Sequence, residues 1–518
     1  MKNALKPLAA LESLALAIAL LILPCHAATA GSAPILAAPA APGEGGEEGE
    51  CFTVLVGKKA SADGAVMIAH NEDDRGAIIV NVRKIRGRDA GSSRRVDLGK
   101  GAFYETDSRT NGFLWIEATS QEFADSFVNE HGVAITSDAC PSRATEEDYT
   151  DGGIGWMLRR LLAEKAASAR EAVRLAGELV ERYGYRSSGR TYSIADKDEA
   201  WMLAILRGRR WYAQRVPDDE VAVIPNYYTI RQIRPGDADH FLGSPDIVEY
   251  AARSGWYDEA EDGPFDFKKA FDRPTSRQPI EDGNTLRHWR GLCLVTGRPW
   301  KLGGGYPFSV RPGKKMTAAA LMAILRDHYE GTEYDATNGY QTGTPNKTRF
   351  RTICTASTID SFIVSLRSDR PEPLSAAIWL AFGKPDTTIY VPFYYGVGAL
   401  PPGAGVGTSE PDDALLARQH FADAPLQAGK GRLLNTAVLE LEKAAEENYR
   451  FVHSTIERRL FPEERAFLKN RPKFEKKFEA LYARDQAQAM KLLDDYAAAA
   501  FVRAAGLTAR LLGKPAGQ

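Results

Sequence analysis

The sequence is poor in cysteine and histidine, with 5 and 8 of these among 518 residues. Cys51, Cys140, Cys293 and Cys354 lie far apart, and the histidines contain no HExxH pair. Such spacings are typical neither of a disulfide scaffold nor of a zinc site. We therefore expect no metal cofactor and at least one buried, unpaired thiol if Cys51 stays reduced. The pairing of the other cysteines stays open.

Net charge is also low. The chain has 66 basic and 68 acidic residues, and residues 1–50 hold two lysines and five glutamates, so 64 basic and 63 acidic residues remain without them. This balance excludes the strongly basic surface of a protein that binds nucleic acid or anionic membranes. We expect no nucleic-acid partner.

Long apolar runs are confined to the beginning of the chain. Residues 1–30 show the order of an export signal, with two lysines, an apolar stretch at 14–23 and small residues at 28–30. No later segment reaches the roughly 20 apolar residues that a spanning helix needs. We predict a signal peptide, no membrane insertion after its removal, and a secreted or periplasmic protein. Lipid attachment at Cys25 is a secondary alternative.

Cys51 is the most informative residue. It follows residues 31–50, a stretch of Ala, Pro, Gly and Glu that has little to bury and is predicted to be a flexible pro-segment. Cleavage before Cys51 would give one residue both a thiol and a free α-amino group. Because an α-amino group titrates at about 8, it can accept the thiol proton near neutrality.

After Cys51 the pattern is strand-rich. Two β-rich runs within residues 52–73, joined by a polar turn at 61–64, predict a hairpin. Turns this short do not leave room for the crossover helices of a parallel sheet, so we predict an α+β layered fold with mainly antiparallel sheets. Further strands are predicted at 77–85, 131–139, 191–195, 200–206, 211–216 and 352–366.

Helical periodicity interrupts and then follows the strands. It predicts helices within 154–183, where Ser168 can begin a second helix, and within 317–329. We expect a catalytic domain at 51–400 and, at 401–518, a Pro/Gly linker followed by a helical C-terminal region that packs on the core. An interface of a homo-oligomer is the alternative use of these helices.

Several motifs carry a resemblance to a known family. They are Cys51 with TVLVGKKAS, IAHNED, NEHGVAI, GWMLRRLLAEKAASAREAV, DKDEAWML, VAVIPNYYTIRQI and WLAFGKPDTTIYVPFYYGV, in this order. Together they resemble the cysteine dipeptidases of the N-terminal nucleophile (Ntn) hydrolases, relatives of secernins, penicillin V acylases and bile salt hydrolases. The resemblance runs from Cys51 to about Val397 and implies a four-layer αββα sandwich that cleaves amide bonds.

The resemblance also implies three catalytic residues. Cys51 matches the nucleophile and base. Asp73, in HNED, matches the carboxylate that orients the α-amino group. Asn226, in IPNYYTI, matches the side chain that donates to the oxyanion.

Other residues are candidates for binding substrate or orienting the site. Arg351 is similar in context to an active-site arginine, with Arg349 as the alternative. His70 stands where the acylases have arginine, and a neutral histidine supplies no permanent charge. We interpret His70 as a packed strand residue rather than a catalyst. Asn71 and Asn129 are further candidates for orienting the site.

The sequence thus predicts an exported cysteine dipeptidase that needs no cofactor or metal and whose partner is a dipeptide or small peptide. Two alternatives stay open. One is an acylase of the same superfamily acting on N-acyl amides. The other is a non-catalytic envelope protein that retains the fold.

Overall fold

The structure is a computed structural model that describes residues 51–74, 78–91, 93–119, 123–340, 343–346, 348–405 and 433–513. The predicted signal peptide (1–30), the predicted pro-segment (31–50) and residues 406–432 of the predicted linker lie outside the described residues. No described helix is long and apolar enough to cross a membrane.

The first sheet begins directly after Cys51 and has six strands in the order β12-β1-β2-β14-β15-β16, all paired antiparallel. β1 and β2 form the predicted hairpin, with Thr53 opposite His70. Its turn contains Gly64, whose φ of +77° favours glycine. The strands are β1 (Phe52–Val56), β2 (Val66–Asp73), β12 (Val221–Ile224), β14 (Thr358–Leu366), β15 (Ala376–Phe382) and β16 (Val391–Tyr394).

The second sheet has eight strands in the order β13-β11-β10-β9-β8-β7-β6-β3, again all antiparallel. A separate two-stranded ribbon is formed by β4 (Arg94–Gly99) and β5 (Ala102–Thr106). The strands of the second sheet are β3 (Val80–Ile85), β6 (Phe113–Ala118), β7 (Ser126–Asn129), β8 (Ala134–Ala139), β9 (Tyr185–Ala195), β10 (Ala200–Gly208), β11 (Trp211–Arg215) and β13 (Phe241–Gly243).

Several strands are shorter than their predicted ranges, and two of these begin only after a turn. In 131–139 the strand starts only at Ala134, because a turn with Gly132 at a φ of +76° precedes it. In 352–366 the strand starts at Thr358, because the Ser357 backbone N–H donates to the Thr355 hydroxyl within a turn.

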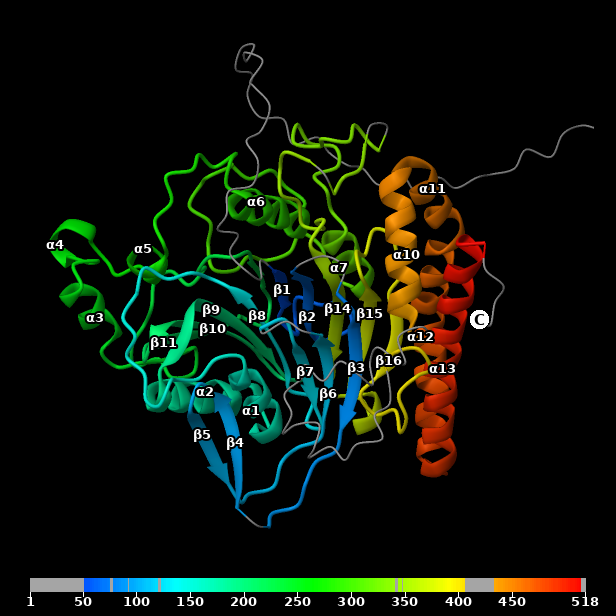
Figure 1. Cartoon of the computed structure of the whole chain (residues 1–518), viewed down its shortest axis with the longest axis horizontal. Coiled ribbons are helices and arrows are strands. Elements are labelled where there is room, and N and C mark those ends of the chain that lie inside the picture. Colours follow the sequence, from blue (N-terminus) through cyan, green and yellow to red (C-terminus); the bar gives the residue numbers. More distant parts are fainter. Residues whose placement is uncertain are drawn as a thin grey trace, which may run out of the picture.

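Helices cover the outer face of each sheet, which completes the αββα order (Figure 1). α1 and α2 pack on the second sheet, and α6 and α7 pack on the first. Ser168 begins α2 as predicted, because its side chain accepts the backbone N–H of Glu171. The helices are α1 (Met157–Lys165), α2 (Ala169–Tyr183), α3 (Ile247–Arg253), α4 (Glu259–Asp262), α5 (Phe267–Phe271), α6 (Gly283–Thr296), α7 (Ala318–Leu325) and the 3₁₀ helix η1 (Glu372–Leu374).

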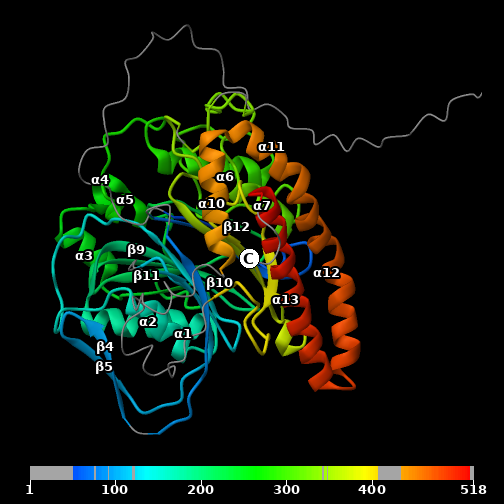
Figure 2. The ribbon, with the colours of Figure 1, turned by 45° about the vertical axis from the view of Figure 1, so that its right-hand side comes forward.

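Four C-terminal helices stand beside the edge of the first sheet, at β15 and β16 (Figures 1 and 2). Phe501 packs edge to face on Phe393 of β16, at a ring distance of 5.8 Å. The helices are α10 (Leu434–Glu447), α11 (Tyr449–Arg459), α12 (Phe461–Tyr482) and α13 (Gln486–Leu511).

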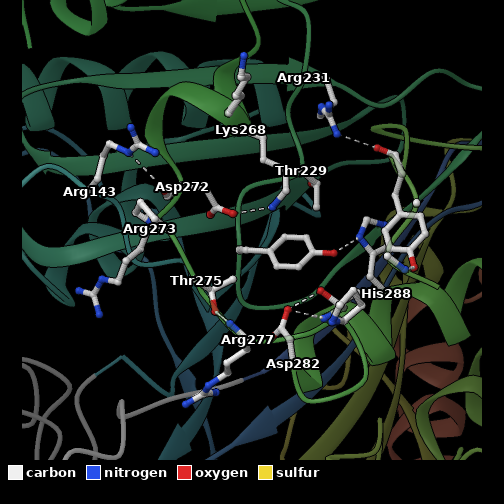
Figure 3. Close-up of a pocket in the computed structure, with 18 residues that line it drawn as sticks. Arg143, Thr229, Arg231, Lys268, Asp272, Arg273, Thr275, Arg277, Asp282 and His288 are labelled. Carbon is white, nitrogen blue, oxygen red and sulfur yellow. Dashed lines mark hydrogen bonds and ion pairs between the residues drawn. The ribbon is translucent and has the colours of Figure 1, made fainter. Parts of the chain in front are cut away.

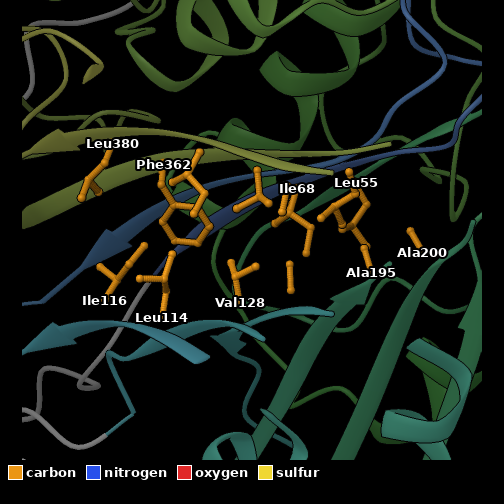
Figure 4. Packing of buried hydrophobic residues seen from close by; sticks show 14 of the residues in the cluster. Leu55, Ile68, Leu114, Ile116, Val128, Ala195, Ala200, Phe362 and Leu380 are labelled. Carbon is orange, nitrogen blue, oxygen red and sulfur yellow. The ribbon is translucent and has the colours of Figure 1, made fainter. Parts of the chain in front are cut away.

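The space between the two sheets holds the main hydrophobic core (Figure 4). Leu55, Ile68 and Phe362 of the first sheet face Leu114 and Val128 of the second. This packing determines which face of β1 and β2 points into the space between the two sheets. Because side chains alternate along a strand, the same pattern places the residues of the HNED motif.

Candidate active site

Cys51 lies immediately before β1, with its side chain fully buried. Its Sγ donates to Oε1 of Glu72 on β2, at 3.0 Å. Burial raises the pKa of the Cys51 thiol well above its ordinary value, and the carboxylates of Glu72, Asp138 and Asp73 act in the same direction. The thiol therefore needs a base before it can act as a nucleophile.

The HNED motif is divided between two faces of the first sheet. His70 and Glu72 lie on the face of β2 that carries Ile68, between the sheets, whereas Asn71 and Asp73 lie on the face covered by α6 and α7. One motif therefore contributes to both sides of Cys51.

On the face of the first sheet that points toward the second sheet, here called the inner side, a chain of hydrogen bonds connects the Cys51 thiol to the second sheet. Oε2 of Glu72 lies 3.1 Å from Nε2 of His70, and Nδ1 of His70 lies 2.7 Å from the hydroxyl of Thr53. Thr53 donates to Oδ2 of Asp138 on β8, at 2.8 Å. While Asp138 is ionised, the only hydroxyl proton of Thr53 is used there, and His70 Nδ1 donates to Thr53. His70 is thus a buried strand residue with a defined place beside the thiol.

Asp138 makes the stability of the site depend on pH. Burial raises the pKa of Asp138 to about 7, against the lowering effects of His70 and Thr53. The folded state then holds a proton that the unfolded state, with an Asp pKa of about 3.9, has lost. Its contribution to stability is present below pH 4 and is lost as pH rises to about 7.

We therefore expect the free energy of unfolding of the wild type to fall relative to Asp138→Asn by up to about 1.4 kcal/mol per pH unit between pH 4 and 7. Urea unfolding across this range measures the difference. The similarly raised pKa of Asp125, also about 7, is shared by both proteins and cancels. Parallel stability curves would contradict this assignment.

On the face of the first sheet that α6 and α7 cover, here called the outer side, Asp73 is fully buried and lies between two arginines. Its Oδ2 accepts from Arg351 at 3.1 Å and lies 3.8 Å from Nη1 of Arg287, while Thr358 donates to Oδ1 at 2.6 Å. Burial raises the pKa of Asp73 in spite of Arg351 and Arg287, which lower it. The structure thus brings the predicted residues Asp73 and Arg351 together, whereas Arg349 stacks on Phe350.

Arg287 of α6 joins the outer side to the nucleophile, and the sequence analysis missed it. Its Nη1 donates to the backbone carbonyl of Cys51 at 3.1 Å, and its Nη2 donates to Oδ1 of Asn226 at 2.7 Å and to Asn284. The guanidinium is fully buried. No local motif marks it, because its partners Cys51 and Asn226 are 236 and 61 residues away.

Asn226 follows β12, the neighbour of β1 in the sheet. Because Arg287 holds its Oδ1, the amide is oriented with Nδ2 as the remaining donor. This Nδ2 is buried and has no hydrogen-bond partner among the described residues. A preorganised donor of this kind is what an oxyanion requires.

The two other predicted asparagines hold backbone groups. Asn71 donates to the carbonyls of Leu325 and Ile353, both at 2.9 Å, and so ties β2 to the end of α7 and to the segment before β14. Asn129 donates to the carbonyls of Ala163 and Ala166 at the end of α1. The described contacts of Asn129 do not include Cys51, so the structure does not place it with the other candidates.

The four described cysteines are all buried and form no disulfide. The thiols of Cys140 and Cys354 confirm the expectation of buried, unpaired cysteine. Cys51, His70 and Glu72 also have ligand atoms within 4.8 Å of one another, a spacing that could hold a metal ion.

Two cavities open beside α6. One of about 310 Å³ is lined by Arg277, Arg349, Arg351, Glu281 and Asp282, and Asn284 connects it to Arg287. The other, of about 380 Å³, shares Arg277 and Asp282 with it (Figure 3). Its charged lining comprises six basic and two acidic side chains: Arg143, Arg231, Lys268, Lys269, Arg273, Arg277, Asp272 and Asp282.

Comparison with known proteins decides the family. Residues 50–413 match the family described as Peptidase family C69. The chain belongs to this family. The predicted family and the αββα sandwich with antiparallel sheets are thereby confirmed, and the chain is a cysteine-type peptidase.

The curated relatives of this peptidase include a "Probable dipeptidase" of Salmonella dublin, 27% identical over 385 residues that cover 69% of this chain and 83% of the relative. "Dipeptidase A" of Lactobacillus helveticus is 27% identical over 388 residues, 68% of this chain and 76% of the relative. A solved structure, a variant of conjugated bile acid hydrolase from Clostridium perfringens, has 10% identity and a TM-score of 0.30, covering 64% of this chain and 92% of that one.

Proposed function

We propose that this peptidase is an exported cysteine dipeptidase whose nucleophile, Cys51, becomes the first residue when residues 1–50 are removed. The observation that carries the proposal is the arrangement around Arg287. One guanidinium binds the carbonyl of Cys51 and the amide oxygen of Asn226, which leaves the buried Asn226 Nδ2 as an unused donor. The names of the curated relatives support a dipeptide as the substrate.

In the proposed reaction, the new α-amino group of Cys51 takes the thiol proton, directly or through one water. The thiolate attacks the carbonyl carbon of the peptide bond, and the oxyanion accepts a hydrogen bond from Asn226 Nδ2. The α-ammonium group protonates the leaving amine as the C–N bond breaks, which leaves a thioester. Water then attacks the thioester, and the α-amino group takes a proton from this water. The C–S bond breaks, the carboxylic acid product leaves, and the α-ammonium group returns a proton to the sulfur of Cys51.

The charges of the smaller cavity suit a zwitterionic substrate. Arg277, Arg349 and Arg351 supply guanidinium groups that pair well with a carboxylate. Glu281 and Asp282 line the same cavity and can bind an ammonium group. A dipeptide carries one group of each kind, whereas a long acyl chain would find only three apolar side chains there, Ile280, Leu286 and Phe350.

Export is part of the proposal, supported by the order of residues 1–30, which is that of a signal peptide. The proposed location is outside the cytoplasm, in the periplasm or the medium. N-terminal sequencing of exported protein tests both parts, since the proposal requires Cys51 as the first residue.

Substrate comparison tests the activity. Protein that begins at Cys51 is incubated with unmodified dipeptides, with the same dipeptides blocked at either end, and with N-acyl amino acids of long chain. We expect the highest kcat/KM for free dipeptides and a rise in KM when the carboxylate is amidated. Faster turnover of long-chain acyl substrates would make the protein an acylase instead, and no turnover of any of them would support the non-catalytic alternative.

Asn226→Ala is expected to lower kcat by about 10²- to 10³-fold with little change in KM, because the lost donor acts on the oxyanion and not on the bound substrate. Steady-state kinetics on a dipeptide measure this effect. Asn129→Ala is the matched control, since the described side-chain contacts of Asn129 are all with backbone groups, at the end of α1 and in the turn between β7 and β8. It should lower stability and leave kcat near the wild-type value. Equal effects of the two substitutions on kcat would contradict the role of Asn226.

A further inference from the structure

A second cluster of metal-ligating side chains lies outside the active site. His328 follows α7, Cys354 lies in the segment before β14, and Asp386 lies between β15 and β16. All three side chains are buried, and their ligand atoms lie within 4.8 Å of one another. The residues are at least 26 positions apart in the sequence, which is why their spacing showed no metal motif.

The imidazole of His328 is oriented as in a metal ligand. Its Nδ1 lies 3.3 Å from Oε1 of Glu330 and 3.2 Å from the hydroxyl of Tyr340, and its backbone N–H donates to Glu330 at 2.7 Å. A carboxylate that holds Nδ1–H leaves Nε2 with its lone pair. This Nε2 is buried without a hydrogen-bond partner and points toward Asp386, whose Oδ2 is 3.7 Å away.

The surroundings of Asp386 and Cys354 also favour a bound cation. Oδ2 of Asp386 accepts from Tyr449 of α11 at 2.6 Å, but its Oδ1 is buried without a partner. A buried carboxylate oxygen that is left unpaired is costly. Cys354 is fully buried within reach of both groups. A cation among the three would satisfy Nε2 and Oδ1 together.

We propose that His328 Nε2, Cys354 Sγ and a carboxylate oxygen of Asp386 bind one divalent transition-metal ion of the zinc type. A thiolate and a carboxylate balance the two charges of the ion, and a mixed N, S and O ligand set suits zinc. In a tetrahedral zinc site, bond lengths of 2.0–2.3 Å put neighbouring ligand atoms about 3.3 to 3.7 Å apart. Nε2 of His328 and Oδ2 of Asp386 are 3.7 Å apart, so a shift of a few tenths of an ångström would bring them to the separation of a nitrogen and an oxygen ligand on one ion. Binding releases the thiol proton of Cys354 to solvent, and no oxidation or reduction takes place.

The site would link three parts of the fold. It joins the end of α7 to the segment that carries Arg351, three residues before Cys354. Through the bond between Tyr449 and Asp386 it also reaches the C-terminal helix α11. Since the ligands are buried, we assign the ion a structural role, and its binding does not depend on the peptidase reaction.

The test measures metal content and ligand identity. The purified protein is equilibrated with Zn²⁺, dialysed and analysed for bound zinc. A second sample is equilibrated with Co²⁺, which gives a charge-transfer band when a thiolate binds it. We expect about one tightly bound ion per chain and a cobalt–thiolate band. Cys354→Ser should abolish the band, and Asp386→Asn should reduce the bound zinc.

Two controls separate this site from other thiols. Cys51→Ala removes the thiol that lies near His70 and Glu72, and Cys293→Ser removes another buried cysteine. Both should retain the ion and the band, including Cys51→Ala in the absence of activity. Failure of the peptidase assays and failure of metal binding are therefore distinguishable.

If Cys354→Ser does not fold, the wild type still tests the proposal. A chelator should then lower its melting temperature, and added Zn²⁺ should restore it. Wild-type protein that binds no zinc, or a band that is lost in Cys51→Ala but kept in Cys354→Ser, would overturn the proposal. His328 would then be an imidazolium paired with Glu330 and Asp386.

Discussion

Cys51→Ala is expected to lower kcat for dipeptide hydrolysis by about 10⁴- to 10⁶-fold, the loss typical of a removed nucleophile. The thiol forms the covalent bond in the proposed mechanism, and Arg287 binds the backbone carbonyl of the same residue and the side chain of Asn226. The residual rate should come from Asn226 and substrate binding alone. The variant should be made as a chain that begins at residue 51, so that a failure of cleavage does not obscure the result.

Cys293→Ser serves as the matched control for this experiment. It removes a second buried thiol, from α6, and should keep kcat close to that of the wild type. Cys51→Ser keeps a weaker nucleophile in the same place, and its kcat should lie between those of Cys51→Ala and Cys293→Ser. Hydrolysis by Cys51→Ala within tenfold of the wild-type rate would exclude Cys51 as the nucleophile.

A blocked amino group on Cys51 is expected to reduce kcat as severely as loss of the thiol. An amide nitrogen is not basic, whereas a free α-amino group, with a pKa of about 8, accepts the thiol proton. Burial and the carboxylate of Glu72 raise the pKa of Cys51, so the thiol cannot ionise unaided near neutrality. Protein that retains only Glu50 before Cys51 should therefore be inactive on dipeptides.

Trimming that single residue with an aminopeptidase supplies the matched comparison, since both samples contain the same thiol. Activity should appear in proportion to the fraction of chains that begin at Cys51, as measured by mass spectrometry. Equal activity before and after trimming would mean that another group, such as Glu72 with His70, serves as the base.

Local patterns in the sequence determined much of the fold. The alternation of apolar residues and the polar turn within 52–73 predicted the β1–β2 hairpin, which the register of Thr53 and His70 confirms. The capping side chain of Ser168 predicted the start of α2. These features depend on neighbours a few residues away, and the motif order that indicated the family is also local.

The candidate site was predictable only where motifs mark it. Asp73 and Arg351 proved to be partners, and Asn226 lies beside the residue that orients its amide. Asn129 was placed with the site by its motif, but its side chain binds the end of α1. Roles for these residues in catalysis stay predictions for the experiments above.

The sequence by itself determined the strands and helices, the family, and Cys51 at the start of a hairpin. Only the tertiary structure decided that Arg287 binds the carbonyl of Cys51, that Thr358 binds Asp73, and that His328 meets Asp386. These pairs are separated by 236, 285 and 58 residues. Contacts across such separations arise when sheets and helices pack together, and they leave no periodic signal in the chain.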